Sequence, residues 1–217
     1  MKCPHCNEPV GPQQSRCGMC GFSAISLHGY LGNQWVKLER ITDAAQGLRL
    51  EDKRRLEVTL DDFERSFPQV FFATYLGVLP NNVSAAELGF WLLNQGAFNT
   101  PSIIRRNDFG IILVVDPAMR TVCLTLGYAI EKWIPPKTIQ QILQATGKHL
   151  AHGAFGTAIE QACLLCATSL KKNARKVDWE PAQPGLPSGS PDMGLTLLRG
   201  NHRPASRPLA GLSQNAR

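Results

Sequence analysis

The spacing of apolar residues predicts an amphipathic helix in the stretch LEDKRRLEVTLDDFERSF, which ends before Pro68. Its apolar residues recur at intervals of four, three and four, at Leu56, Leu60, Phe63 and Phe67. This spacing places the apolar side chains on one face of a helix and leaves the charged side chains on the other. The stretch therefore predicts a helix with one face on a core.

Two stretches rich in β-branched and aromatic residues predict strands, QVFFATYLGVL at 69–79 and FGIILVVD at 109–116. Between them, Ser84 and Glu87 have the S-x-x-E spacing of a capping box, which predicts that a helix begins there. A strand, a helix and a second strand form a crossover unit whose two strands run parallel. The stretch RTVCLTLGY at 120–128 then predicts an antiparallel return strand.

The sequence KTIQQILQATGKHL, after Pro135 and Pro136, and the sequence GAFGTAIEQACLLCATSLKKNARK predict two more helices. We therefore expect helices on both faces of a short mixed sheet, an α/β fold. The chain has 217 residues, of which 43% are hydrophobic, enough for one sizeable core. We expect one main domain at 34–177, after a linker at 26–33. The Pro-, Gly- and Ser-rich residues 178–217 predict a disordered tail.

Four of the seven cysteines form two C-x2-C pairs with ten residues between them, at Cys3, Cys6, Cys17 and Cys20. Two such pairs supply four thiolates in tetrahedral geometry, which is typical of structural zinc. Four thiolates leave no open position for a catalytic water, and a short segment with few apolar residues needs the metal to fold. We therefore predict a small zinc ribbon at 1–25, and we regard an iron–sulfur or redox site as the alternative.

The other three cysteines are Cys123 on a predicted strand and Cys163 and Cys166 on a predicted helix. Cys163 and Cys166 repeat the C-x2-C spacing, but no second pair of ligands lies near them in the sequence. We therefore predict that these three thiols pack in the core.

The formal net charge of the chain is +6, with a sequence pI of about 9.1. The excess of cations is concentrated at the end of the last predicted helix, in Lys171, Lys172, Arg175 and Lys176. Cations interact favourably with the dipole at a helix C-terminus, so we interpret this cluster as a solvated helix end. Binding of nucleic acid is the weaker interpretation.

The beginning of the chain does not resemble a secretory signal, because Met1 and Lys2 lead directly into the first cysteine pair. No stretch approaches the roughly 18 apolar residues of a membrane-spanning helix. An odd number of cysteines, with four of them placed to bind metal, favours a reducing compartment. These features predict a soluble cytoplasmic protein without a transmembrane segment.

Between Gln34 and Lys172 the chain resembles the TPM domain family. The resemblance rests on a motif around ITDAAQGL, on the strand NDFGIILVV and on the hairpin DPAMRTVCLTLGYAIE. The matching positions are Asp43, Leu48, Asn107, Gly110, Leu113, Asp116, Arg120, Gly127 and Glu131. Their order and spacing over about ninety residues carry the resemblance, which implies an α/β/α sandwich.

The resemblance implies two classes of function. Some TPM proteins are described as low-activity phosphatases or as binders of divalent metal, whereas others act as assembly or repair factors. If this chain is a phosphatase, the resemblance places Asp116 and Arg120 in the catalytic site. Apart from the resemblance, the loops at the ends of the parallel strands could bring Asp43 and Glu131 to Asp116, where they would be ligands of a divalent cation, calcium or magnesium.

Local chemistry alone gives Asp116 a simpler role, because Asp followed by Pro117 is common in the first two positions of a turn. We therefore favour a noncatalytic interaction or assembly module in which the zinc ribbon and the TPM-like domain together bind a protein or a membrane-associated assembly. The alternative is a slow phosphatase that depends on a divalent metal. The two hypotheses differ in whether Asp43 and Glu131 fold against Asp116.

Overall fold

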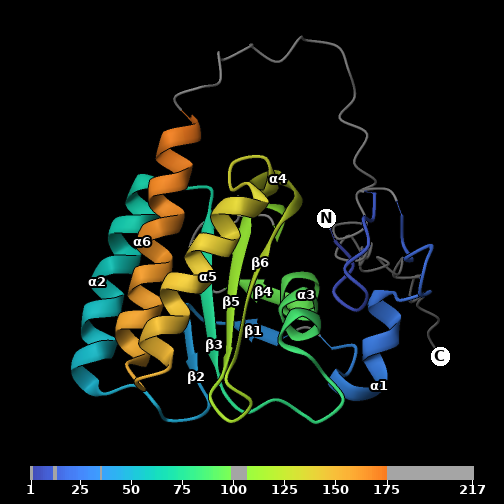
Figure 1. The fold of residues 1–217 in the computed structure, drawn as a ribbon, viewed down its shortest axis with the longest axis horizontal. Helices are drawn as coiled ribbons and strands as arrows, with labels where there is room; N and C mark the ends of the chain where they lie inside the picture. Colours follow the sequence, from blue (N-terminus) through green and yellow to red (C-terminus); the bar gives the residue numbers. More distant parts are fainter. Residues whose placement is uncertain (1, 12–13, 35, 99–106, 175–217) are drawn as a thin grey trace, which may run out of the picture. The chain divides into compact units, whose positions relative to one another are not determined.

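The computed structural model describes residues 2–11, 14–34, 36–98 and 107–174. Its central feature is a four-stranded sheet in the order β2-β3-β5-β6 (Figure 1). The strands are β2 (Ile41–Asp43), β3 (Phe71–Leu76), β5 (Gly110–Asp116) and β6 (Thr121–Leu126). The first three strands are parallel and β6 is antiparallel to β5. The predicted mixed sheet is therefore confirmed.

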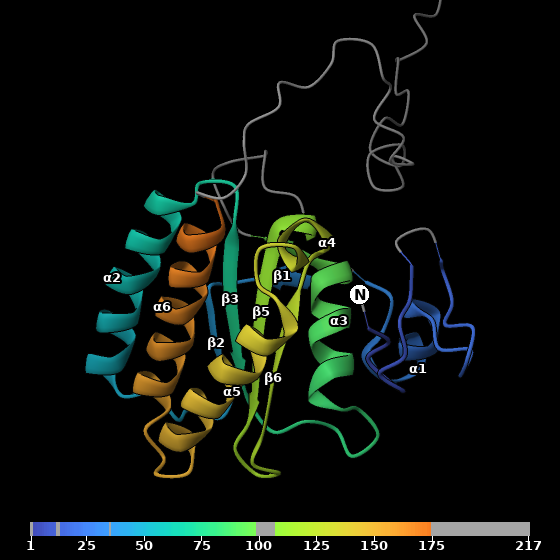
Figure 2. The same cartoon turned by 45° about the horizontal axis from the view of Figure 1, so that its top comes forward.

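Helices cover both faces of this sheet. Figures 1 and 2 show α2, α5 and α6 on one side and α3 on the other. These helices are α2 (Leu50–Ser66), α3 (Ala85–Gln95), α5 (Pro136–Leu150) and α6 (Phe155–Ala174). All four were predicted from apolar spacing or from the capping box, and the layered α/β architecture is confirmed.

Several short elements were not predicted. They are η1 (Ala24–Leu27), α1 (His28–Leu31), β1 (Val36–Leu38), β4 (Gly96–Phe98), η2 (Asn107–Phe109) and α4 (Tyr128–Glu131), together with β2. The segment predicted as a linker at 26–33 thus contains helical turns, and Leu27 within it is buried. Elements of three or four residues are too short to show a periodicity. The tail predicted at 178–217 lies outside the described residues.

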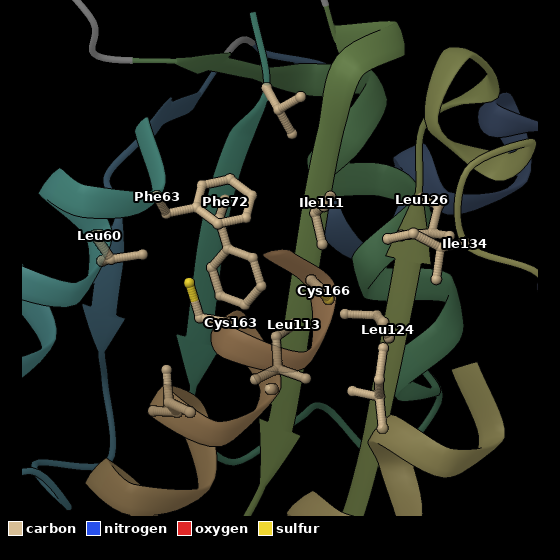
Figure 3. Packing of buried hydrophobic residues seen from close by; sticks show 14 of the residues in the cluster. Leu60, Phe63, Phe72, Ile111, Leu113, Leu124, Leu126, Ile134, Cys163 and Cys166 are labelled. Carbon is tan, nitrogen blue, oxygen red and sulfur yellow. The ribbon is translucent and has the colours of Figure 1, made fainter. Parts of the chain in front are cut away.

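The core on the α2, α5 and α6 side contains two of the cysteines. Cys163 and Cys166 of α6 are buried among apolar side chains of the sheet, including Phe72 and Leu113 (Figure 3). Burial raises the pKa of Cys163 to about 12 and that of Cys166 further still. Both thiols therefore stay protonated, and their predicted packing role is confirmed.

On the other face, α3 approaches β6 closely at Gly89. A Cβ atom at this position would lie 2.3 Å from Oγ1 of Thr125 and 3.2 Å from its Cβ. Thr125 is branched at Cβ and cannot turn its whole side chain away. A glycine in the middle of a helix is unfavourable by itself, so the close contact explains its presence here.

Replacing Gly89 with alanine is expected to lower the free energy of unfolding by about 1–3 kcal/mol, because the new methyl group overlaps Thr125. Urea unfolding followed by circular dichroism measures this change. The matched control is Gly147→Ala in α5, where a Cβ meets nothing within 4 Å. The control is expected to gain up to about 1 kcal/mol from helix propensity. Adding Thr125→Ala to Gly89→Ala should restore stability, and a loss that persists in the double variant would reject this explanation.

Candidate functional site

Four cysteine side chains converge in the N-terminal segment. The sulfur atoms of Cys3, Cys6, Cys17 and Cys20 all lie within 4.8 Å of one another. The distance from Cys3 Sγ to Cys20 Sγ is 3.7 Å, and that from Cys6 Sγ to Cys17 Sγ is 3.6 Å. Four sulfurs bound to zinc at about 2.3 Å in a tetrahedron lie roughly 3.8 Å apart, so the cluster has the dimensions of a metal site.

The two C-x2-C turns have the same backbone geometry. In the first turn, the N–H of Cys3 donates to the carbonyl of Glu8 at 2.7 Å, and the N–H of Asn7 donates to the carbonyl of Cys3 at 2.9 Å. The second turn repeats both bonds, at 2.8 and 2.9 Å, with Cys17, Phe22 and Gly21. Asn7 and Gly21 each follow the second cysteine of their pair and have φ of 62° and 72°. Asn and Gly tolerate this left-handed conformation best, which explains their presence there.

The environment of the thiols favours binding of a cation. Backbone N–H groups of Cys20 and Met19 lower the pKa of Cys17 to about 7. At Cys6, the N–H of Glu8 lowers the pKa, but burial and the neighbouring thiols together raise it to about 12. Cys17 therefore loses its proton readily, whereas the neighbouring thiols oppose loss of the proton from Cys6. A divalent cation removes this opposition, because it binds thiolates.

The cysteine segment is attached to the start of α3. Nδ1 of His5 lies 2.8 Å from Oε1 of Glu87. The His5 ring stacks on Phe22 at a centroid distance of 5.9 Å, and Phe22 in turn meets the edge of Phe90 at 5.7 Å. Glu87 also closes the predicted capping box, since its Oε2 accepts from the N–H of Ser84 at 2.8 Å. One carboxylate thus holds both the start of the helix and the N-terminal segment.

Glu87 is only 8% exposed, and burial by itself disfavours its ionised form. Hydrogen bonds from the Ser84 N–H and from His5 outweigh burial and lower the pKa of Glu87 below its usual value of 4.5. The ionised carboxylate therefore stabilises the folded chain above pH 4.5, and this contribution is lost as the pH falls through the lower folded value.

Replacing Glu87 with glutamine is expected to cost about 1–2 kcal/mol of unfolding free energy at neutral pH and much less at acidic pH, because protonation removes the same contribution from the parent chain. Urea unfolding at a series of pH values measures this. The control is Glu51→Gln, an exposed acid in the first turn of α2. An equal loss at both ends of the pH range would contradict the assignment.

Asp116 closes the carboxyl end of β5 and is 1% exposed. Its Oδ1 accepts from the N–H groups of Ala118 and Met119, at 2.8 and 3.0 Å. Its Oδ2 accepts from the N–H of Leu79 at 3.1 Å. The carboxylate thus ties the β5–β6 hairpin to the loop that follows β3. This is the turn chemistry that the Asp-Pro sequence indicated, extended by a long-range bond to Leu79.

Asp43 closes the carboxyl end of β2 in a similar way. Its Oδ1 accepts from the N–H of Gly47 at 2.9 Å, and its Oδ2 accepts from the N–H of Leu48 at 3.1 Å. Nζ of Lys53 lies 3.3 Å from the same Oδ2. Asp43 therefore fixes the loop into α2, and its charge is balanced by a lysine of that helix.

The sequence-predicted residues fall on two edges of the sheet. Asp43 and Asp116 share the edge at the carboxyl ends of the parallel strands, with β3 between them, so strand spacing separates their positions by roughly 10 Å. Glu131 lies in α4, which follows β6 at the opposite edge, where Leu126 pairs with Ile111. The structure therefore does not bring Glu131 to Asp116.

Arg120 lies in the hairpin after Asp116, exposed to solvent and with φ of 53°. In the described part of the chain, the cysteine cluster is the one group of three or more side chains able to hold a metal ion together. The contact between His5 and Glu87 was missed by sequence reasoning. The capping box explained Glu87 fully, and no sequence signal indicated that the N-terminal segment binds there.

The protein is thus a layered α/β domain that carries a four-cysteine segment able to bind a metal. A family model of the TPM domain matches residues 41–168, so the chain belongs to the TPM domain family. This confirms the resemblance found in the sequence. A search of the curated proteins gave no significant match.

Three solved structures are similar to this chain, each with a TM-score of 0.48. The N-terminal domain of a protein from P. gingivalis is 18% identical and aligns over 64% of this chain and 87% of its own. The N-terminal domain of the cg2496 protein from Corynebacterium glutamicum is 13% identical, over 68% and 90%. The BA42 protein from Bizionia argentinensis is 13% identical, over 62% and 91%.

None of the helices among the described residues has both the length and the apolar character needed to cross a bilayer.

Proposed function

We propose that this TPM protein is a noncatalytic interaction or assembly module, in which a structural zinc ribbon and the TPM domain act together on a protein partner. The proposal rests on the burial and the hydrogen bonds of the Asp116 side chain. Both of its oxygens accept backbone hydrogen bonds, and the side chain is 1% exposed. A nucleophile or metal ligand needs a free, accessible oxygen, and Asp116 holds the two loops instead.

Zinc is the metal that the cysteine cluster fits best, since four thiolates at these distances match a closed tetrahedral site. In this role the metal holds the ribbon together. The ribbon in turn contacts α3 through His5 and Phe22, so it presents a surface continuous with the TPM domain. This arrangement supports a role in binding a partner for the surface formed by the ribbon together with α3.

The alternative is a slow phosphatase with an acidic metal site at the ends of the central strands. It would need Asp116 to release backbone N–H groups and a second carboxylate to come near. Hard divalent cations such as magnesium and calcium require several oxygen ligands. Asp43 is the nearest candidate of the predicted set, and its oxygens also accept backbone hydrogen bonds.

A phosphatase assay on the zinc-loaded chain separates the two candidates. We expect no turnover of a generic phosphate ester with magnesium, calcium or manganese, and no rise in melting temperature on adding these ions. Turnover that is lost in Asp116→Asn and kept after deletion of the ribbon would overturn the proposal. The melting temperature of Asp116→Asn must be measured alongside, so that loss of activity is not confused with loss of fold.

A further inference from the structure

An open groove lies between α5 and α6, where α5 begins and α6 ends (Figure 1). Its volume is about 370 Å³, which is within the range of ligand pockets. Buried Ile142 and half-buried Leu165 form its apolar part. Its polar lining consists of Thr138 and Gln141 from α5 and of Thr168, Ser169, Lys172 and Asn173 from α6. The groove therefore combines hydrogen-bonding groups with an apolar patch that an incoming side chain can cover.

The shape of the groove is fixed by the carbonyl oxygen of Trp133. Oγ of Ser169 donates to this oxygen at 3.1 Å, and Nδ2 of Asn173 donates to it at 2.6 Å. Both bonds tie the last turns of α6 to the connection that precedes α5. In contrast, the side chains of Thr138, Gln141 and Lys172 make no hydrogen bond or ion pair with another described residue. These three groups are therefore available to a ligand.

The chain that forms this groove carries a positive charge. From residue 132 to residue 173 there are five lysines and a single acid, Glu160. Glu160 lies near the start of α6 and accepts from Nε of Arg55 at 2.8 Å, so its charge is balanced there. Lys172 lines the groove and Lys137 is next to it in the sequence, and both are exposed. An anionic group entering the groove thus meets cations from both helices.

The acids of α2 do not cancel this charge. Figures 1 and 2 show α2 beside α6, on the side away from α5. The second half of α2 contains three acids, and each is close to an arginine. Nη1 of Arg40 lies 2.6 Å from Asp61 and 3.9 Å from Glu64, and Nη1 of Arg65 lies 3.3 Å from Asp62.

The acids nearest to the start of α5 in the sequence lie toward another part of the molecule. Burial, together with the negative charges of Glu131 and Asp108, raises the pKa of Tyr128, so both acids are near this phenol. Tyr128 lines a small pocket together with residues of the N-terminal cysteine segment and with Phe90 of α3. Glu131 and Asp108 are thus associated with the α3 side, and no acid is among the described residues that line the groove.

We propose that this groove binds an acidic peptide segment of a protein partner, whose apolar side chain covers Ile142 and Leu165 and whose carboxylates pair with Lys172 and Lys137. The amide of Gln141 offers both a donor and an acceptor, which a peptide backbone complements. The positive charge attracts an anionic partner and excludes a cationic one. This inference goes beyond the proposed function, because it concerns a different face from the surface formed by the ribbon together with α3.

A peptide is a better match than single-stranded nucleic acid. Proteins bind single strands by stacking bases on aromatic side chains along a basic groove. Among the described residues that line the groove, none is aromatic and none is arginine. The lining instead provides hydroxyl and amide groups around an apolar patch, which suits a segment with backbone amides and one apolar side chain.

Fluorescence anisotropy on the full-length, zinc-loaded chain tests the proposal. The probe is a labelled pool of short peptides in which one leucine stands among aspartates and glutamates. We expect saturable binding that weakens as salt is added, and no binding of a matched pool with asparagine and glutamine in place of the acids. Lys137→Gln with Lys172→Gln is expected to weaken binding about tenfold, at roughly threefold for each cation. Gln141→Ala is expected to weaken it about fivefold through the lost hydrogen bonds.

The chain offers matched controls on α5. Lys148 and Gln140 are exposed like the residues they match, but they do not line the groove. Lys148→Gln and Gln140→Ala should therefore bind the acidic pool like the parent chain. Absence of binding by the parent chain at low salt would overturn the proposal. Unchanged binding in both groove variants would overturn it too, since basic residues elsewhere would then account for the binding. Tighter binding of oligothymidylate, lost in the same variants, would assign the groove to nucleic acid instead.

Discussion

Replacing Cys17 with serine is expected to remove bound zinc from the chain and to unfold the ribbon. Cys17 is 3% exposed, and backbone N–H groups lower its thiol pKa to about 7, so it is the ligand best prepared to bind as thiolate. Binding of structural zinc supplies about 10–16 kcal/mol toward the folding of short zinc-binding segments, and a site with three thiolates keeps only part of it. Zinc content by mass spectrometry and hydrogen exchange of residues 2–27 measure the two effects.

The control for this variant is Cys123→Ser. Cys123 is a half-buried thiol of β6, and its sulfur lies 3.9 Å from Thr125 Oγ1, outside the cysteine cluster. Zinc content should stay at one ion per chain in the control. If Cys17→Ser keeps a full complement of zinc and the same exchange protection, the four-cysteine site is rejected.

Replacing Asp116 with alanine is expected to lower the free energy of unfolding by roughly 3–5 kcal/mol. The substitution removes the acceptor of the Leu79 N–H, whose hydrogen bond is buried, and of the Ala118 and Met119 N–H groups, whose hydrogen bonds are partly buried. Asp116→Asn keeps one carbonyl oxygen but turns an amide donor toward an N–H group, so we expect about half of that loss. Urea unfolding monitored by circular dichroism gives both values.

Asp62→Ala is the control for Asp116→Ala. The Asp62 side chain is 65% exposed and lies 3.3 Å from Arg65, an exposed pair that is expected to contribute less than about 1 kcal/mol. A loss of under about 1 kcal/mol in Asp116→Ala would show that the carboxylate does not hold the loops. Such a result would also favour a catalytic role for Asp116.

The long elements of the fold could be predicted because each carries its own signal. Apolar spacing identified α2, and the Ser84–Glu87 pair located the start of α3. Strand β2 could not be found in this way, because its residues pair with β3 but are too few to show alternation. Its existence depends on partners that lie 33 residues further along the chain, such as Thr74 opposite Ile41.

The site was predictable where ligands are close in sequence. The spacing of the cysteine pairs was enough to predict their convergence. The relation between Asp116 and Glu131 was not predictable from their separation of fifteen residues, because it depends on the direction of β6. An antiparallel return strand carries Glu131 away from the edge where Asp116 lies. The contact between Glu87 and His5 could not be predicted either, since the two residues are 82 positions apart in the sequence.

The packing of the ribbon provides the chain with an internal optical reporter. Trp91 of α3 is 6% exposed, belongs to the same apolar cluster as Cys3 and Cys17, and donates its indole N–H to the carbonyl of Gly32 at 3.1 Å. If loss of the metal loosens this cluster, the emission of Trp91, one of four tryptophans in the chain, is expected to move to longer wavelength. Tryptophan fluorescence would then report binding of a metal by the cysteine cluster on the unlabelled protein.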